Sequence, residues 1–187
     1  MARRTAARIA EAALAIVVRE GAEAVSMRRV AAVVGVTPMA IYRHYPNRDA
    51  LMLAVAEHGR AQLAERCRLR PGRRPARAEL KATVNALLDF ALEQPRLYAL
   101  LTEQQAQESA ELGDDAPALG AVVAAVDEAM HREALAPDDV DQVAVGIVAL
   151  MHGLILLYLS RRLPLAEPEF RLLYAASLTR LLNGIST

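Results

Sequence analysis

Residues 26–51 of the chain read SMRRVAAVVGVTPMAIYRHYPNRDAL, and this stretch decides the fold of the region around it. Its apolar residues have the spacing of two short helices, with Ser26 as the first N-cap, followed at once by the start of a third helix. Gly35 stands at the turn, where glycine adopts a left-handed backbone without steric cost. Thr37 and Pro38 provide the next N-cap and a proline at the first helical position. The stretch therefore predicts a helix-turn-helix.

The apolar and basic residues of this stretch are arranged as in a DNA-binding unit. Six residues fall where the two helices must pack: Val30, Ala31, Val34, Val36, Ile41 and Tyr45. Polar and basic residues surround them: Arg28, Arg29, Tyr42, Arg43, His44 and Arg48. A small helix with a positively charged surface suits the major groove of DNA. The alternative is an ordinary helical corner of a bundle, whose basic residues are merely solvated.

The segment IYRHYPNRDAL, residues 41–51, resembles the end of the DNA-binding domain in tetracycline-repressor-like (TetR-type) transcriptional regulators. The resemblance extends over about residues 5–55, with Tyr45 where Phe is usual and Arg48 where Lys is usual. Residues 150–159, LMHGLILLYL, are similar to the helix-eight motif of a subgroup. The resemblance implies an all-α fold of about nine helices. A three-helix DNA-binding domain would precede a helical ligand-binding and dimerisation domain.

By this resemblance, ten residues are expected to contact double-stranded DNA. Those facing the groove are Arg28, Thr37, Pro38, Met39, Ala40 and His44; those at phosphates are Ser26, Tyr42, Arg43 and Arg48. Arginine binds guanine O6 and N7 with two hydrogen bonds, and small apolar side chains meet thymine methyls. A recognition helix of about two turns reads few base pairs. We therefore expect a homodimer on a palindromic operator.

Helical patterns separated by proline and glycine continue along the chain. Beyond the predicted helices at residues 5–20, 26–35, 37–45 and 47–68, others are expected at about 78–93, 96–110, 118–135, 138–162 and 169–183. Residues 69–77, LRPGRRPAR, are expected to form a loop at the domain boundary. The predicted domains are residues 1–50 for DNA binding, a connecting helix at 47–68, and residues 69–187 for ligand binding and dimerisation.

Composition and charge agree with this division. The 187 residues are 54% hydrophobic and 24% charged, with no net charge. Residues 1–75 hold fourteen arginines against six acidic residues, while residues 76–187 hold eight basic against sixteen acidic residues. The excess of positive charge in the first part favours binding to a polyanion, and the negative excess in the second part disfavours it. The start of the chain is expected to be an amphipathic helix rather than a signal peptide, which predicts a cytoplasmic protein.

Two helices near the end are expected to contribute to a dimer interface. Residues 143–160 carry no charged side chain and meet the minimum length of a membrane span. His152, two glycines and three preceding aspartates disfavour a span. Small residues allow a second helix to approach closely, and the next helix has an apolar stripe. The expected interface residues are Gly146, Ala149, Gly153, Leu173, Tyr174, Ser177, Leu178 and Leu181.

The resemblance implies that a small molecule binds the second domain and that residues 47–68 transmit the change. This reasoning predicts a repressor released from its operator by a mainly hydrophobic effector. The candidate ligand residues are Phe90, Tyr98, Leu101, Gln105, Val126, Met130, Met151, His152 and Ile155, each of which is also a candidate for plain core. The alternatives are a DNA-binding protein without an effector, and a helical carrier or enzyme with an incidental helix-turn-helix-like corner.

The remaining sequence signals are weak. We find no catalytic motif, no Gly-rich phosphate loop and no expected cofactor or metal. Asp127 and His131 stand one helical turn apart, a spacing typical of a solvated surface pair but also open to a shared metal ion. Cys67 excludes a disulfide within the chain. Its arginine neighbours would lower the pKa of an exposed thiol, so a redox role is an alternative to an incidental cysteine.

Overall fold

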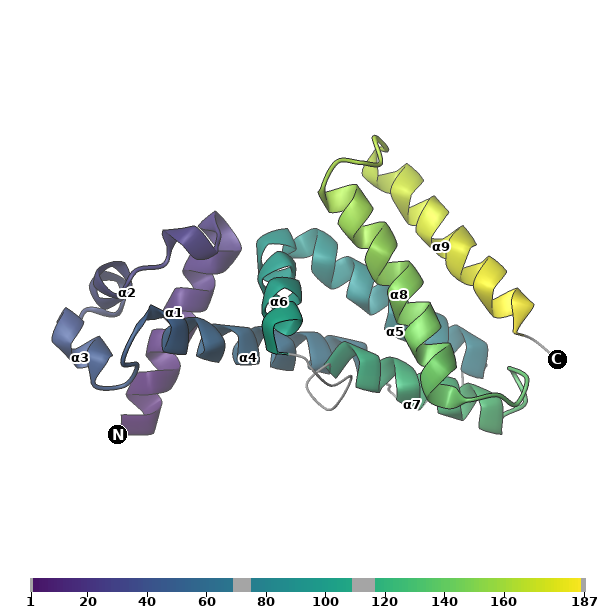
Figure 1. Cartoon of the computed structure of the whole chain (residues 1–187), viewed down its shortest axis with the longest axis horizontal. Helices are drawn as coiled ribbons and strands as arrows, with labels where there is room; N and C mark the ends of the chain where they lie inside the picture. The colour runs from purple at the N-terminus through teal and green to yellow at the C-terminus, as the bar shows by residue number, and fades with distance from the viewer. Residues whose placement is uncertain (1, 69–74, 109–116, 186–187) are drawn as a thin grey trace. The chain divides into compact units, whose positions relative to one another are not determined.

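The chain is all-helical throughout the residues that the structure, a computed structural model, describes (Figure 1). These are residues 2–68, 75–108 and 117–185, with side chains described for 4–68, 75–103 and 119–185. They form α1 (Ala2–Glu20), the 3-10 helix η1 (Ala22–Ala24), α2 (Met27–Val34), α3 (Pro38–Tyr42), α4 (Arg48–Cys67), α5 (Ala76–Glu93), α6 (Pro95–Glu108), α7 (Pro117–His131), α8 (Val140–Leu159) and α9 (Glu167–Gly184). The predicted all-α class with about nine helices is confirmed, whereas η1 was not predicted.

Several helix ends differ from the predicted ones. The five residues of α3 make it shorter than the expected two turns. A residue with a left-handed backbone follows α7 and α8, Glu133 at φ 55° and Arg161 at φ 58°, so both helices end earlier than predicted. At the start of α8, the carboxylate of Asp139 accepts a hydrogen bond from the Gln142 N–H at 3.0 Å. α8 therefore begins at Val140, two residues later than the predicted start at residue 138.

The chain divides into two compact units. The N-terminal unit comprises Met1–Gln62 and Leu92–Asp115, and the C-terminal unit comprises Leu63–Ala91 and Ala116–Thr187. The division falls within α4 and within α5 and groups α6 with α1 to α3. The predicted boundary at residue 69 divides the chain at a single point and places α6 in the second domain. In the structure α6 belongs to the N-terminal unit.

The core of the N-terminal unit forms around α1. Ile9, Ala13, Ile16 and Val17, the face predicted from their helical spacing, are fully buried. α1 packs against α2 and α6, and α2 packs against α3. A Cβ added at Gly59 of α4 would lie 2.9 Å from Leu97 Cδ1 of α6, so only glycine leaves room for that side chain.

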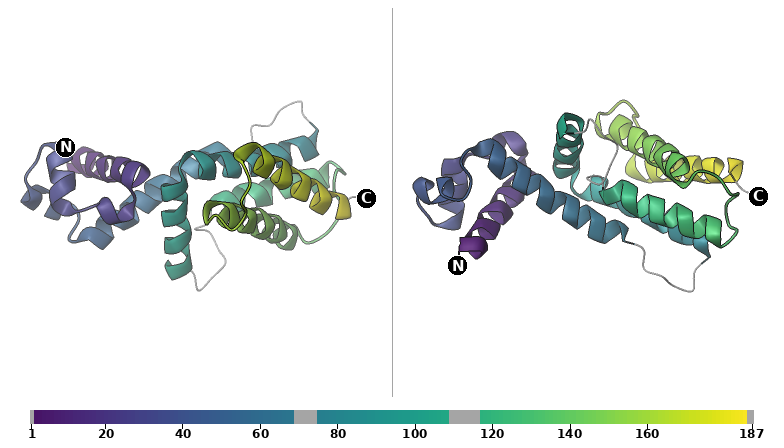
Figure 2. Two further views of the ribbon diagram at one scale, coloured as in Figure 1. Left: turned by 90° about the horizontal axis from the view of Figure 1, so that it is seen from above. Right: turned by 60° about the horizontal axis from the view of Figure 1, so that its bottom comes forward.

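The C-terminal unit is built on α8 and α9, which lie side by side (Figure 2). Phe170 of α9 stacks on Tyr158 of α8, with ring centroids 4.0 Å apart. The buried Tyr174 donates a hydrogen bond from its hydroxyl to the Val84 carbonyl of α5 at 3.1 Å. Aromatic packing and this hydrogen bond therefore join α5, α8 and α9.

α8 carries four large apolar side chains that are partly exposed. Val145, Leu150, Leu156 and Leu157 are between 37% and 40% exposed. α8 is the one helix of the described residues that is long and apolar enough to cross a membrane by length and composition alone. Only 22% of its apolar window is buried within the protomer. α8 therefore presents a partly exposed apolar surface.

Candidate functional site

Residues 26–45 form the predicted helix-turn-helix. Gly35 has φ 78° and ψ 36°, and its N–H donates to the Ala31 carbonyl at 2.9 Å. The Val36 N–H donates to the same carbonyl at 3.0 Å, which closes the turn. Of the six residues predicted to pack here, Val30, Ala31 and Ile41 are buried, and Val34, Val36 and Tyr45 are half-buried.

Both helices of this motif begin at a hydroxyl side chain. Ser26 Oγ accepts a hydrogen bond from the Arg29 N–H at 3.2 Å, and Thr37 Oγ1 accepts one from the Ala40 N–H at 3.3 Å. A hydroxyl that accepts in this way still has its own hydrogen to donate. The two residues can therefore cap a helix and donate a hydrogen bond to a partner at the same time.

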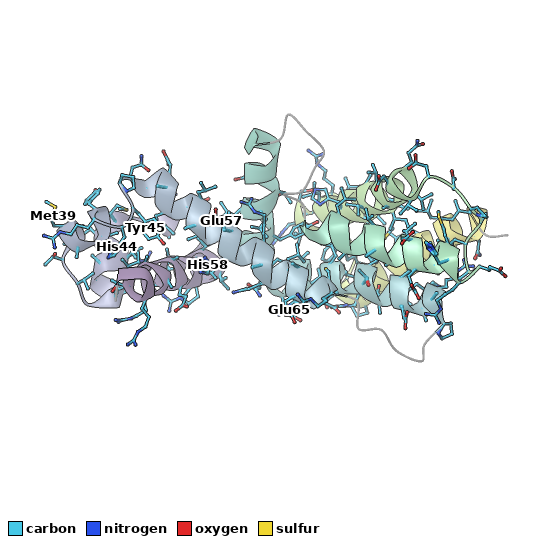
Figure 3. The ribbon with its side chains drawn as sticks, turned by 90° about the horizontal axis from the view of Figure 1, so that it is seen from below. Met39, His44, Tyr45, Glu57, His58 and Glu65 are labelled. Carbon is cyan, nitrogen blue, oxygen red and sulfur yellow. The ribbon has the colours of Figure 1, made fainter. Side chains whose placement is uncertain are left out.

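The predicted base-reading and phosphate-contacting side chains lie mostly on the surface. Met39 is 66% exposed and Tyr42 48% exposed, although both are large and at least partly apolar. Figure 3 shows Met39 at one end of the N-terminal unit, with Tyr45 nearer the middle of that unit. Arg28, Thr37, Pro38 and Arg43 are also exposed, while Ala40 and His44 are half-buried. Val33 of α2, 57% exposed, is a further apolar residue of this unit's surface that was not predicted.

Arg48 lies against the main chain, which the sequence reasoning did not foresee. Its Nε donates to the Val25 carbonyl at 3.0 Å and its Nη2 to the Ala22 carbonyl at 2.6 Å. These bonds orient the guanidinium group, which stays exposed, so the role of Arg48 at a phosphate stays a prediction. The carbonyls lie 23 and 26 residues away in sequence, so no local pattern would have revealed them.

The other departure from the usual family residues also has a structural partner. Tyr45 is half-buried, and its hydroxyl donates to the Ala6 carbonyl of α1 at 3.1 Å. Burial and the nearby carboxylate of Glu57 raise the pKa of Tyr45. A phenylalanine could not make this hydrogen bond.

Arg29 forms an ion pair with Glu20 at the end of α1. The distance from Nη2 to Oε1 is 2.5 Å, and Nη1 donates to the Ala24 carbonyl at 3.3 Å. The hydrogen bond from Arg29 holds the pKa of Glu20 below its ordinary value. Arg29 therefore connects α2 to the end of α1.

The predicted ligand residues do not all lie in one unit. Tyr98 and Leu101 of α6 are buried in the N-terminal unit, and the side chain of Gln105 lies outside the described residues. In the C-terminal unit four are buried and two half-buried: Phe90, Val126, Met151 and Ile155, then Met130 and His152. The guanidinium carbon of Arg66 lies 5.6 Å from the Phe90 ring centroid. Burial lowers the pKa of His152.

The predicted interface residues divide into an exposed and a buried group. Gly146 and Ala149 are exposed and Gly153 is half-buried, and a Cβ added at either glycine would meet no atom within 4 Å. Tyr174 and Leu178 are instead buried inside the protomer, which corrects their assignment to a surface. Leu173, Ser177 and Leu181 are half-buried. Leu172, 72% exposed, was missed.

Cys67 is buried, whereas the acid–histidine pair lies on the surface. Burial raises the pKa of Cys67 to about 11, against the lowering expected for an exposed thiol near arginines. His131 Nδ1 lies 3.2 Å from Asp127 Oδ1 on the surface, and the Asp127 backbone carbonyl and then its carboxylate raise the pKa of His131. The described residues contain no group of three or more acidic, histidine or cysteine side chains that could hold a metal ion.

Two protein-family models match the chain. The model of the tetracyclin repressor-like C-terminal domain matches residues 80–181, more than half of the chain. The model of the bacterial regulatory proteins of the tetR family matches residues 9–55, which include α2 and α3. No curated protein matches the chain in sequence.

Solved structures share the fold along nearly the whole chain. A Rhodococcus sp. RHA1 protein of unknown function is 23% identical, with a TM-score of 0.81 over 97% of this chain and 95% of that one. A regulatory protein in the tetR family from Rhodococcus RHA1 is 21% identical, with a TM-score of 0.67 over 97% and 96%. BioQ, solved with its natural double-stranded DNA operator, is 24% identical, with a TM-score of 0.66 over 96% of both chains.

Proposed function

The chain belongs to the TetR family of DNA-binding transcriptional regulators, and we propose that it is a homodimeric repressor that a small, mainly hydrophobic effector releases from a palindromic operator. The family is not one of enzymes. The observation that carries the proposal is the surface of α2 and α3. Large side chains such as Met39 and Tyr42 remain exposed there, although burial would stabilise them. DNA is the partner for which such a basic, partly apolar surface is suited.

We assign nine of the predicted residues to DNA contact. Base edges would meet Arg28, Thr37, Pro38, Met39, Ala40 and His44, and phosphates would meet Ser26, Tyr42 and Arg43. Seven of the nine are exposed, and the hydroxyl hydrogens of the two caps can be donated, which supports this assignment. The structure of BioQ with its operator makes the same kind of partner reasonable here.

We propose that two copies associate through the exposed face of α8, with α9 contributing Leu172 and the half-buried Leu173, Ser177 and Leu181. Gly146, Ala149 and Gly153 recur at helical spacing beside exposed leucines, so a second helix can approach closely. The apolar face of α8 would then be covered by protein rather than lipid, consistent with a cytoplasmic protein. A symmetric dimer also presents two recognition helices to two half-sites.

The effector is proposed from the family and from the apolar side chains of α5, α7 and α8. Met130 and His152 are half-buried, which leaves them accessible to a ligand. A second candidate function is a DNA-binding protein whose C-terminal unit only dimerises. The full burial of Phe90, Val126 and Met151 favours this candidate, because those side chains pack as core.

Selection of a duplex from a random library by the full-length protein tests DNA recognition. Arg28→Ala should weaken binding to the selected duplex by about 1–3 kcal/mol and relax the preference at one base pair of each half-site. Arg68→Ala, at an exposed arginine just after α4, is the matched control and should change neither the affinity nor the base preference. Selection of no sequence, or equal effects of the two variants, contradicts the proposal.

The effector is tested with the same selected duplex. A panel of hydrophobic and charged small molecules is added to the protein–duplex complex, and release is followed by fluorescence anisotropy. Ligand control of DNA binding is supported if hydrophobic compounds release the duplex from the wild-type protein but not from Met130→Lys. Affinity that no compound changes favours the second candidate function.

A further inference from the structure

We infer that Arg48, together with Arg29 and Arg96, forms an arginine clamp that positions the recognition helices, and that Arg48 is a positioning residue rather than a phosphate contact. The clamp consists of these three guanidinium groups and the carbonyl oxygens of residues 19–25 to which they donate. This inference rests on the proposed recognition of a DNA operator and adds to it which arginines act indirectly.

The clamp gathers side chains from three helices on one short connection. Arg29 of α2 donates to the Ala24 carbonyl at 3.3 Å, and Arg96 of α6 donates to the Arg19 carbonyl at 2.6 Å. Arg48, the first residue of α4, spans the Ala22 and Val25 carbonyls at 2.6 and 3.0 Å. All of these residues belong to the N-terminal unit.

The chemistry of the connection explains why it attracts cations. The last carbonyls of a helix lack intrahelical partners and carry the negative end of its dipole. α1 ends at Glu20, and the positive φ of Gly21, 102°, then turns the chain into η1. Glu20 adds a negative charge, and Arg29 pairs with it. Guanidinium groups supply both the charge and several N–H donors.

The clamp lies directly before α2 in the chain and so determines where that helix begins. Val25 immediately precedes Ser26, the N-cap of α2, so the Arg48 guanidinium fixes the point where α2 begins. α2 carries Arg28 and buries Ala31 against α3. Loss of the clamp would therefore shift the base-reading side chains without removing any of them.

The dependence of DNA affinity on salt distinguishes positioning from phosphate contact. Each phosphate neutralised by a side chain contributes about one to the slope of log K against log salt concentration. Arg43→Gln is the comparison variant, since Arg43 is exposed and assigned to a phosphate. It should reduce the slope by about one per protomer. Arg48→Gln and Arg96→Gln should each weaken binding about tenfold with an unchanged slope.

The experiment uses full-length protein and the duplex selected by the wild type, with affinities measured between about 50 and 200 mM salt. Arg48→Lys keeps the charge but loses the planar fork that reaches both carbonyls, so its affinity should match that of Arg48→Gln. Wild-type affinity in the lysine variant, or a slope reduced in Arg48→Gln as in Arg43→Gln, overturns the inference.

Hydrogen exchange gives a readout that does not depend on DNA. Arg48→Gln should increase exchange at the amides of residues 25–30, while Arg43→Gln should not. Unchanged protection in Arg48→Gln would also overturn the clamp. Failure of the proposed function would instead appear in the wild type, as the absence of any selected duplex.

Discussion

A leucine at Gly146 should separate the two copies of the protein without harming the fold of either. In the protomer, a Cβ at Gly146 meets no atom within 4 Å, so the added side chain has open space. Replacing glycine inside a helix also favours the helix by about 0.8–1.0 kcal/mol. The protomer alone should therefore be as stable as the wild type or more so.

The interface should respond in the opposite direction. Overpacking costs about 1–3 kcal/mol per site, and a two-fold symmetric interface contains the substitution twice. A total of about 2–6 kcal/mol corresponds to a dimer dissociation constant raised about 30- to 20,000-fold. Binding to a palindromic duplex should weaken as well, because one protomer occupies only one half-site.

Sedimentation equilibrium over a wide range of protein concentration measures the dissociation constant, and circular dichroism measures the helix content. Gly120→Leu is the matched control, since Gly120 is an exposed helical glycine of α7 with equally open surroundings. The control should leave the dimer intact. A dissociation constant unchanged by Gly146→Leu, or weakened equally by Gly120→Leu, refutes the reasoning.

Four further predictions concern the folded chain. Gly59→Val should destabilise it by about 1–3 kcal/mol in thermal or urea unfolding, because a Cβ there already lies 2.9 Å from Leu97; equal stability would contradict the close approach of α4 and α6. Tyr45→Phe should lower the free energy of unfolding by about 1 kcal/mol, because the hydrogen bond to Ala6 is lost. An unchanged free energy of unfolding would show that this bond does not stabilise the protein. The Cys67 thiol, with a pKa raised to about 11, should react with iodoacetamide at pH 8 about a hundredfold more slowly than in the unfolded chain. Since the folded protein keeps this proton between about pH 9 and 11 while the unfolded chain loses it, stability should fall with rising pH in that window, and less so in C67A.

The local features of the helix-turn-helix could be predicted from the sequence because each depends on a few adjacent residues. The caps at Ser26 and Thr37, the left-handed turn at Gly35 and the buried Ala31 all lie where the pattern placed them. Hydrogen bonds between neighbouring residues set these features, and tertiary packing only adds to them.

Features that depend on distant partners could not be predicted. The side chain of Arg48 finds carbonyls more than twenty residues away, and no local rule distinguishes that partner from a phosphate. The apolar periodicity of α9 indicated a stripe, but not that Tyr174 would be buried against α5 within the protomer. The exposed Leu150, Leu156 and Leu157 lie on the same side of α8 as Gly146 and Gly153. Their helical spacing could have added these leucines to the predicted interface.

The two hydroxyl caps have a consequence for which replacements the chain can accept. Aspartate caps a helix as well as serine or threonine, so an aspartate at position 26 or 37 would preserve the helices. It would have no hydrogen to donate at pH 7, and its negative charge would face the polyanion. Folding alone would admit serine, threonine, asparagine, aspartate or glycine at these positions, and of these aspartate is the one whose charge a polyanion repels. Ser26 and Thr37 are therefore places where a fully folded protein could lose its partner through a change of a few atoms.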